Sequence, residues 1–271
     1  MNIPYLLNLT NTLLIDPESI NSFLKAHPFY NELHYFEEIP STNDFAKKEE
    51  CRSNAVVLTS FQTSGKGRLG RKWLSVPNEN LTFSLKLKLN ISPDLNRYVI
   101  FFVSYIIFDT LQQFLKKENV GTEPLSIKWP NDILWNNRKL CGILTESILK
   151  TGEYVIGIGL NVNQLNFAPD IEAASISDIT GKQHDLNGLL VQLLTNLKNN
   201  IHLLESQNHK QLFNLWLDST NMTGKQCSFS MGNESLKYGF INSLNEDGTI
   251  SIETNGEIIS YSSGDIKLMD Y

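Results

Sequence analysis

The sequence predicts an α+β fold, with one large domain that mixes strands and helices and a small β-rich domain at the C-terminal end. The 271 residues are enough for two domains at about 150 residues each. Strand-like and helix-like patterns alternate up to residue 221, and short strands separated by turn sequences follow. Hydrophobic residues make up 41% of the chain and charged residues 19%, which is typical of a folded globular protein.

Two short helices are expected near the start of the chain. Residues 1–33 contain one of them, which Asp16 would cap and Pro17 would open. Ser41-Thr42-Asn43-Asp44 has the spacing of a capping box and predicts a second helix. Read in isolation, these polar residues are better explained by capping than by contact with a polar ligand.

Two strands and a long helix follow. Residues 55–61 and 81–89 predict strands, and alternating leucine and phenylalanine in the second strand predict one buried face. Residues 98–115 predict a mostly buried helix. Its apolar run over 98–108 is shorter than the roughly 18 residues that span a membrane, so no membrane segment is expected.

The next part of the chain completes the large domain. Residues 125–159 predict a three-stranded meander at the centre of the sheet, with turns at Asn136-Asn137 and Lys150-Thr151-Gly152. Leucines recur at helical spacing over 186–204, and a second helix is expected over 209–217.

Beyond Thr223 the sequence changes to short strands, which is typical of a small barrel or a hairpin stack. The turns between these strands are expected at Met231-Gly232-Asn233, Asp247-Gly248 and Asn255-Gly256. We therefore expect a short N-terminal segment over 1–33, a large domain over 34–221 and a C-terminal domain over 222–271.

Charge is unevenly distributed along the chain. The net charge of -6 argues against indiscriminate binding to nucleic acid. Between Glu50 and Glu79, however, there is no carboxylate, and this stretch forms a basic segment in an acidic protein. Its positive residues are Arg52, Lys66, Arg68, Arg71 and Lys72.

The cysteines and histidines indicate neither a disulfide framework nor a metal centre. Cys51, Cys141 and Cys227 are odd in number and far apart, which suits a reducing compartment. The N-terminus lacks the features of a secretory signal, so a cytoplasmic location is expected. The five histidines are scattered, without His-x-x-x-His or Cys-x-x-Cys spacing, and we expect no metal ion held by protein side chains.

The basic segment contains a glycine-rich loop, Gly65-Lys66-Gly67-Arg68-Leu69-Gly70-Arg71-Lys72-Trp73. A dinucleotide site would need a helix starting at these glycines, and the chain instead continues as an extended segment to Pro77. A phosphate-loop ATPase is also excluded, because Gly67 stands where serine or threonine should bind magnesium. We interpret the segment as a flexible loop that binds phosphate and carboxylate, with a solvated basic turn as the alternative.

Two motifs in the predicted meander offer cationic side chains. Lys128-Trp129-Pro130-Asn131-Asp132 would turn between strands and present Lys128 to a triphosphate, with Asp132 orienting that lysine or a magnesium ion. A salt-bridged turn is the alternative. Arg138-Lys139-Leu140-Cys141-Gly142-Ile143-Leu144 places Lys139 at the mouth of the next strand, where it could offset a developing negative charge.

Glycines also lie inside a predicted strand. In Gly157-Ile158-Gly159-Leu160-Asn161-Val162-Asn163 they favour a ligand close to the backbone over a plain bulge. Gln62, at the end of an earlier strand, could cap that strand or contact a polar ligand.

Taken together and in this order, these motifs resemble those of the biotin protein ligases, which activate biotin with ATP and attach it to a lysine of a carrier domain. The resemblance runs from about Tyr35 to the C-terminus. Each motif is weak alone, whereas the ordered set is specific. The motifs are Ser41-Thr42-Asn43, Gln62 with the glycine-rich loop, and the stretches 128–132, 138–144 and 157–163.

The resemblance implies a mixed, mainly antiparallel sheet flanked by helices, similar to class II aminoacyl-tRNA synthetases and lipoate ligases, followed by an SH3-like barrel. It also implies site residues. The biotin side would contain Ser41, Thr42, Asn43, Gln62, Lys66, Gly67, Arg68 and Lys139. The ATP side would contain Arg71, Trp73, Lys128, Asp132 and Asn161. Lys139, Arg68 and Lys128 would take part in catalysis.

The implied substrates are biotin and ATP, with Mg²⁺ accompanying ATP, and the implied partner is the biotin carrier domain of a carboxylase such as acetyl-CoA carboxylase. A homodimer is compatible with the resemblance. Two alternatives stay open: a lipoate or octanoate ligase of the same fold, and a biotin-sensing regulator.

Two features depart from the family pattern. Lys66 stands where the family usually has arginine, so any bidentate side-chain contact there would be lost. Some members carry an N-terminal winged helix that binds DNA, and the segment before Tyr35 is too short for one. Specific DNA binding is therefore not expected.

Overall fold

The large domain is built on a seven-stranded sheet. Only β1 and β2 run parallel, and every other neighbouring pair is antiparallel, so the predicted mixed, mainly antiparallel sheet is confirmed. The computed structural model describes residues 14–148, 150–206, 208–230 and 235–269. In order across the sheet the strands are β1 (Glu32–Ile39), β2 (Ala55–Gln62), β3 (Asn80–Lys88), β7 (Glu153–Asn161), β6 (Arg138–Ile148), β5 (Asp132–Trp135) and β4 (Leu125–Lys128).

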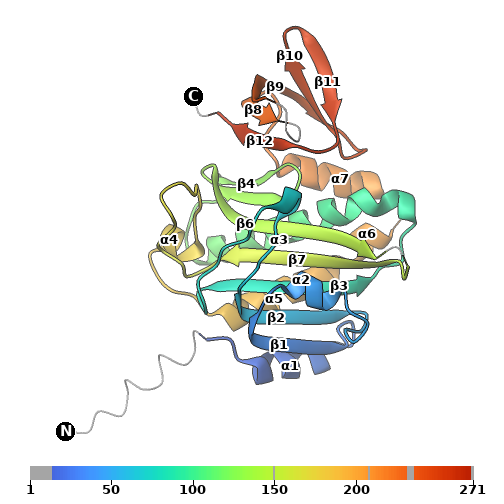
Figure 1. Ribbon diagram of the computed structural model, residues 1–271, viewed down its shortest axis with the longest axis vertical. Helices are drawn as coiled ribbons and strands as arrows, with labels where there is room; N and C mark the ends of the chain where they lie inside the picture. Colours follow the sequence, from blue (N-terminus) through green and yellow to red (C-terminus); the bar gives the residue numbers. More distant parts are fainter. Residues whose placement is uncertain (1–13, 149, 207, 231–234, 270–271) are drawn as a thin grey trace, which may run out of the picture.

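Helices cover the two faces of this sheet unequally. The longer helices α3 and α5 lie behind the sheet in Figure 1, and the short helix α2 lies on the opposite face. The α-helices are α1 (Pro17–Lys25), α2 (Thr42–Ala46), α3 (Asn96–Lys117), α4 (Ile176–Thr180), α5 (Leu186–Asn200), α6 (His202–Glu205) and α7 (His209–Asp218). Two 3-10 turns, η1 (Arg68–Gly70) and η2 (Pro93–Leu95), complete the description.

Strand β3 shows how the sheet separates the core from the α2 face. Leu81, Phe83 and Leu85 are at most 1% exposed and belong to the hydrophobic core. Thr82 and Ser84 alternate with them and point to the opposite face. Burial of such apolar side chains stabilises the fold by roughly 1.5–3 kcal/mol each, which fixes the side of the sheet on which polar groups gather.

Helix α3 is the central helix of the core. By length and composition the stretch Pro93–Lys117 could cross a membrane, with a mean hydropathy of 1.4, but 61% of its most apolar window is buried inside the protein. The buried helix predicted over 98–115 is therefore confirmed.

The C-terminal residues form a second, five-stranded antiparallel sheet, above the large sheet in Figure 1. Two predicted turns are confirmed at Asp247-Gly248 and Asn255-Gly256, where both glycines have positive φ. The third, Met231-Gly232-Asn233, lies outside the described residues. The strands, in sheet order, are β11 (Glu257–Tyr261), β10 (Ile250–Thr254), β9 (Lys237–Leu244), β8 (Gln226–Ser230) and β12 (Asp265–Leu268).

Some expectations about the elements are wrong. Residues 125–159 form four strands rather than three, because the turn at Trp129-Pro130 separates β4 from β5. These four strands are also not the centre of the sheet. They form one side of it, from the middle strand β7 to the edge strand β4. The helix expected over 186–204 is divided at Ile201 into α5 and α6. Neither β1 nor α4 was expected.

The helix starts agree better with the sequence. Asp16 caps α1 with Pro17 in its first turn, and Ser41 caps α2 by accepting a hydrogen bond from the backbone N–H of Asp44. The expected helix over 209–217 is α7. The residue limits of the three domains remain a prediction.

Candidate active site

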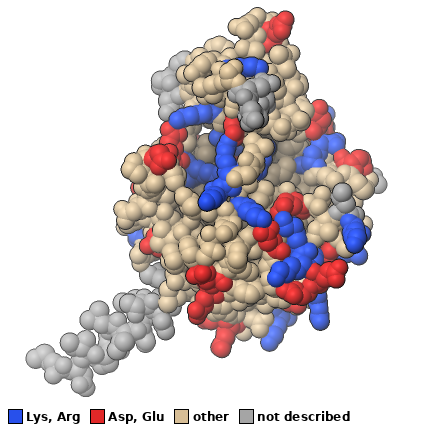
Figure 2. Space-filling model, in the orientation of Figure 1, with Lys and Arg blue, Asp and Glu red and all other residues tan. Residues whose placement is uncertain are grey.

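A cavity on the α2 face of the large sheet collects almost all of the expected site residues. Its walls come from α2, the glycine-rich loop, strands β3, β6 and β7, the β4–β5 turn and the start of β12. Figure 2 shows Lys and Arg side chains gathered around a hollow between the two sheets. Among the expected residues, those that line the cavity are Ser41, Thr42, Asn43, Gln62, Lys66, Gly67, Arg68, Arg71, Trp73, Lys128, Asp132 and Lys139.

One end of the cavity is polar, uncharged and buried. The Thr42 backbone N–H and Oγ1 donate to Gln62 Oε1 at 2.7 and 3.1 Å. Ser84 Oγ, from β3, lies 2.7 Å from Thr42 Oγ1 and donates to Asn43 Oδ1 at 2.6 Å. Each of these side chains is less than 9% exposed. Because the side chains hold one another, this end presents fixed donors and acceptors to a neutral polar group.

The glycines of β7 allow two side chains to lie directly on the strand. A Cβ at Gly157 would come within 3.0 Å of the Asn43 amide, and a Cβ at Gly159 would come equally close to the indole of Trp73. We expected a ligand against this strand. The structure places Asn43 and Trp73 against the glycines, which also line the cavity themselves, so a ligand against this strand stays a prediction.

The glycine-rich loop forms a short hairpin across the cavity. Trp73 N donates to Gly65 O at 2.9 Å, and Gly67 N donates to Arg71 O at 2.8 Å. At the tip, Leu69 and Gly70 have φ of 55° and 74°. The helix that a dinucleotide site would require is absent from the described chain after these glycines, which agrees with the exclusion of that function.

Ion pairs hold this hairpin at two places. Lys66 Nζ lies 2.6 Å from Asp44 Oδ2 of α2, and Arg71 is paired with Asp265 at the start of β12. Arg68 is half-buried and donates from Nη1 to Asn131 Oδ1 at 3.0 Å. The loop therefore contacts α2, the β4–β5 turn and the C-terminal sheet.

The other end of the cavity is cationic. Lys139 Nζ lies 2.8 Å from Asp132 Oδ1 and 5.6 Å from the centre of the Trp73 ring. Lys128, by contrast, has no ion pair within 4.0 Å among the described residues. Burial lowers the pKa of Lys128, and the neighbouring positive charges of Lys139 and Arg71 lower it further, against the opposing effect of Asp132. A half-buried lysine without a close carboxylate is suited to binding an anion.

One expected residue lies elsewhere. Asn161 does not line the cavity, and its Nδ2 donates to the carbonyl oxygens of Lys139 and Ala174 at 3.2 and 3.1 Å. These contacts give Asn161 a structural role beside Lys139, and its assignment to the ATP side stays a prediction.

Other cavity residues were missed. Gly264, Asp265 and Ile266 reach it from the C-terminal sheet, and no local sequence signal marks them. Thr82 lines the cavity, and Ser84 holds Thr42 and Asn43 behind it. Both could have been found, because they are small polar residues that alternate with the apolar residues of their strand.

A match to a known ligase family agrees with the fold and the cavity. Residues 35–163 match the Biotin/lipoate A/B protein ligase family, and the chain therefore contains a domain of this family.

Within that family, the similar proteins include biotin protein ligases. The bifunctional ligase/repressor BirA of Salmonella typhimurium is 27% identical over 94% of this chain and 78% of its own length. The biotin–[acetyl-CoA-carboxylase] ligase of Mycobacterium tuberculosis is 24% identical over 78% of this chain and 77% of its own length. The structure of the Aquifex aeolicus biotin protein ligase in complex with biotin and ATP is 26% identical, with a TM-score of 0.74 over 89% of this chain and 100% of that chain.

Proposed function

We propose that this protein is a biotin protein ligase, which converts biotin and ATP to biotinyl-5′-AMP and then transfers biotin to a lysine of a biotin carrier domain. The observation that carries the proposal is the single cavity in which a buried, neutral polar end meets a cationic end. Biotin has a neutral polar head and a carboxylate tail, and ATP is a polyanion. The two ends match these substrates and bring their reacting groups together.

The first step joins two anions. The biotin carboxylate attacks the α-phosphorus of ATP, the bond from that phosphorus to the bridging oxygen breaks, and pyrophosphate leaves. In our proposal Arg68 and Lys139 offset the charge of the carboxylate, while Lys128 and Arg71 offset the charge of the phosphates. Arg71 must then break its ion pair with Asp265 and contact a phosphate oxygen instead.

Mg²⁺ that arrives with ATP supplies further positive charge to the phosphates when bound. Asp132 and Asp265 are the carboxylates among the residues that line the cavity, so their oxygens are the hard ligands this ion prefers. Asp132 would keep its contact with Lys139 and so hold that lysine in place.

The second step needs no covalent bond to the enzyme. The amine of the carrier lysine attacks the acyl carbon of biotinyl-5′-AMP, the bond between that carbon and the phosphate oxygen breaks, and AMP leaves as the amide forms. The lysine proton passes to solvent or to AMP. The protein positions the two reactants and excludes water.

The proposed reaction predicts pyrophosphate release that depends on biotin. The protein is incubated with MgATP, biotin and a biotin carrier domain, pyrophosphate is assayed, and the carrier is weighed by mass spectrometry. We expect pyrophosphate only when biotin is present and a carrier heavier by one biotinyl group. Lipoate or octanoate in place of biotin serves as the control. Pyrophosphate release that is indifferent to biotin, or that lipoate supports equally, would contradict the proposal.

We further propose that the glycine-rich loop closes over the intermediate and protects the mixed anhydride from hydrolysis. The four positive side chains of this loop, Lys66, Arg68, Arg71 and Lys72, repel one another, and the ion pairs of Lys66 with Asp44 and of Arg71 with Asp265 offset only part of that repulsion until the anions of the substrates arrive. Closure also orders the chain, at a cost of roughly 1–2 kcal/mol per residue, which the substrate contacts must exceed.

Loop closure predicts protection from trypsin. Cleavage after Lys66, Arg68 or Arg71 should be rapid in the free protein and much slower with biotin and MgATP together. Cleavage after Lys150, which is exposed in the β6–β7 turn and does not line the cavity, provides the internal control. Equal protection at Lys150 would indicate global stabilisation, and unchanged cleavage in the loop would refute closure.

The finer assignments of partner and location are also proposals. The carrier domain belongs to a biotin-dependent carboxylase, the protein acts in the cytoplasm, and it does not bind duplex DNA specifically. Support for the last point comes from the net charge of -6, which disfavours contact with the phosphate backbone.

A further inference from the structure

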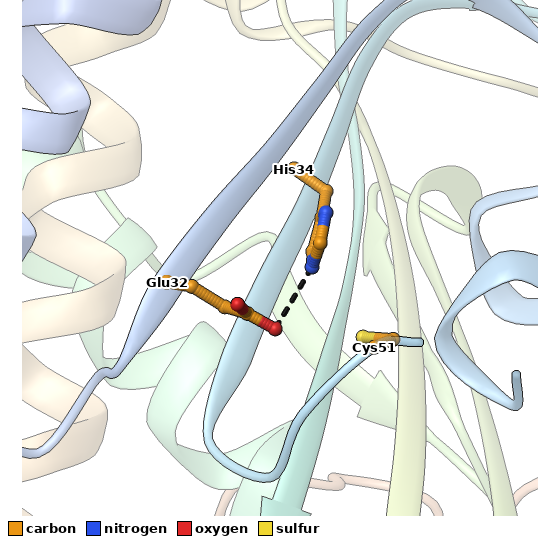
Figure 3. Close-up of side chains that lie close together, drawn as sticks. All are labelled: Glu32, His34 and Cys51. Atoms are coloured by element: carbon orange, nitrogen blue, oxygen red, sulfur yellow. Dashed lines mark hydrogen bonds and ion pairs between the residues drawn. The ribbon is translucent and has the colours of Figure 1, made fainter. Parts of the chain in front are cut away.

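Three side chains with metal-binding atoms meet at the edge of the large sheet, outside the lining of the candidate active site. Glu32 and His34 belong to the edge strand β1, and Cys51 lies in the connection between α2 and β2 (Figure 3). A carboxylate oxygen, an imidazole nitrogen and the Cys51 sulfur all lie within 4.8 Å of one another. None of these residues lines the cavity described above.

The backbone explains why these groups converge. Glu32 and His34 are two residues apart on a strand, so their side chains point to the same side. Cys51 approaches from another segment and is 1% exposed, and Figure 3 shows its sulfur directed toward the pair. Lys86 Nζ donates to the backbone carbonyls of Cys51 and Lys48 at 2.7 and 3.2 Å, which holds that segment in place.

Glu32 and Cys51 retain atoms that can bind a cation, and His34 Nε2 would exchange its 2.9 Å hydrogen bond with Glu32 Oε1 for the ion. The Glu32 hydrogen bonds to His34 and to the Arg52 N–H both use Oε1, which leaves Oε2 available. The Cys51 sulfur makes only a weak contact, 3.9 Å from the carbonyl oxygen of Arg52. The interaction between Glu32 and His34 is an ordinary pair in itself. The buried Cys51 sulfur beside this pair supplies a third metal ligand.

We propose that Glu32, His34 and Cys51 bind one Zn²⁺ ion. Thiolate, imidazole and carboxylate are the three ligand types that zinc accepts, and three protein ligands leave one tetrahedral position for water. On binding, the Cys51 thiol loses its proton to solvent, and the remaining proton of the neutral His34 ring resides on Nδ1 so that Nε2 can donate its lone pair. The ion would tie the α2–β2 connection to strand β1.

This site was not expected from the sequence, which lacks metal-ligand spacing. The sequence could not reveal it because Cys51 is separated from the other two ligands by α2 and is brought near them only by the pairing of β1 with β2. Because none of the three ligands lines the cavity, we assign the ion a structural role, and the proposal does not depend on the ligase activity.

Zinc binding is measured on the full-length, metal-free protein, without biotin or ATP and with excess Mg²⁺ to occupy sites made only of oxygen ligands. A chromophoric chelator competes for Zn²⁺, and Co²⁺ is used in parallel as a spectroscopic probe. The test variants are Cys51→Ser and His34→Gln. The matched controls are Cys227→Ser, another buried cysteine, and His202→Gln, a histidine on α6.

We expect one Zn²⁺ per chain, with affinity at least about 100-fold weaker in Cys51→Ser, since even indirect partners of metal ligands change affinity 10- to 100-fold. Zinc should raise the Tm of the wild-type protein and of both controls. The sulfur-to-cobalt absorption band should be present in the wild type and both controls and absent in Cys51→Ser.

Substoichiometric binding, or equal affinity in the wild type and His34→Gln, would overturn the proposal even if Cys51→Ser failed to fold. Biotin-dependent pyrophosphate release, measured after zinc removal and in the presence of Mg²⁺, should be unchanged, which separates this test from that of the ligase function.

Discussion

Replacing Lys128 by alanine is expected to lower the rate of biotin-dependent pyrophosphate release by about 10²- to 10³-fold, the usual effect of removing one group that stabilises developing charge. Lys128 is half-buried in the cavity and has no ion pair among the described residues, whereas Lys139 is paired with Asp132 and Arg71 with Asp265. Arg68 also lacks an ion pair among them, but it donates a hydrogen bond to Asn131. Pre-steady-state pyrophosphate release with saturating biotin provides the measurement.

Biotin affinity in the absence of ATP is the control for this substitution. It should change far less than the rate, because Lys128 is assigned to the phosphate side. An equal loss of biotin binding would place Lys128 in the biotin site or show that the fold is damaged. Asn161→Ala offers a contrast, since Asn161 bonds to backbone carbonyls and should affect stability more than the phosphate contacts.

The depressed pKa of Lys128 gives the same prediction a pH dependence. Only the protonated amine can offset phosphate charge, and burial places its pKa below the ordinary value of 10.5. In the free enzyme the kcat/KM for ATP should therefore fall as pH rises through this lowered pKa, before an exposed lysine would lose its proton. Lys128→Arg should move this decline to higher pH, because arginine stays protonated. An unchanged alkaline limb would contradict the assignment.

Local sequence signals predicted local structure well. Asp16 with Pro17 and Ser41 mark the starts of α1 and α2, because capping depends on hydrogen bonds between residues a few positions apart. Alternation in β3 likewise predicted its buried face. Strand β1 carried no such signal, since its side chains are half-exposed or exposed and it is rich in glutamate. Its pairing with β2 depends on a segment beyond the intervening helix.

For the candidate active site, too, local sequence signals identified some residues, whereas residues placed by long-range packing were missed. Motif residues such as Lys128 and Lys139 could be assigned from sequence, because each lies at a strand end or turn that the pattern already marked. Asp265 could not, because it reaches the cavity through the packing of the C-terminal sheet against the glycine-rich loop. Asn161 lies within a matching motif, yet its orientation depends on the backbone of Lys139 and Ala174.

Gly157→Ala is expected to weaken biotin binding by roughly 5- to 150-fold, which corresponds to about 1–3 kcal/mol for disrupting a buried hydrogen-bonded group. The added Cβ would come within 3.0 Å of the Asn43 amide. Asn43 cannot easily move aside, because its Nδ2 donates to Glu146 Oε2 at 2.8 Å and its Oδ1 accepts from Ser84. Titration calorimetry with biotin alone provides the measurement.

A double-mutant cycle tests whether the effect passes through Asn43. If the alanine at 157 acts by displacing that side chain, Gly157→Ala combined with Asn43→Ala should bind biotin no more weakly than Asn43→Ala alone. Gly121→Ala is the matched control, because its nearest neighbour is the carboxylate end of exposed Glu123, which can move into solvent. Additive losses in the double mutant would show that Gly157 itself lies against biotin, which is the interpretation that the sequence first favoured.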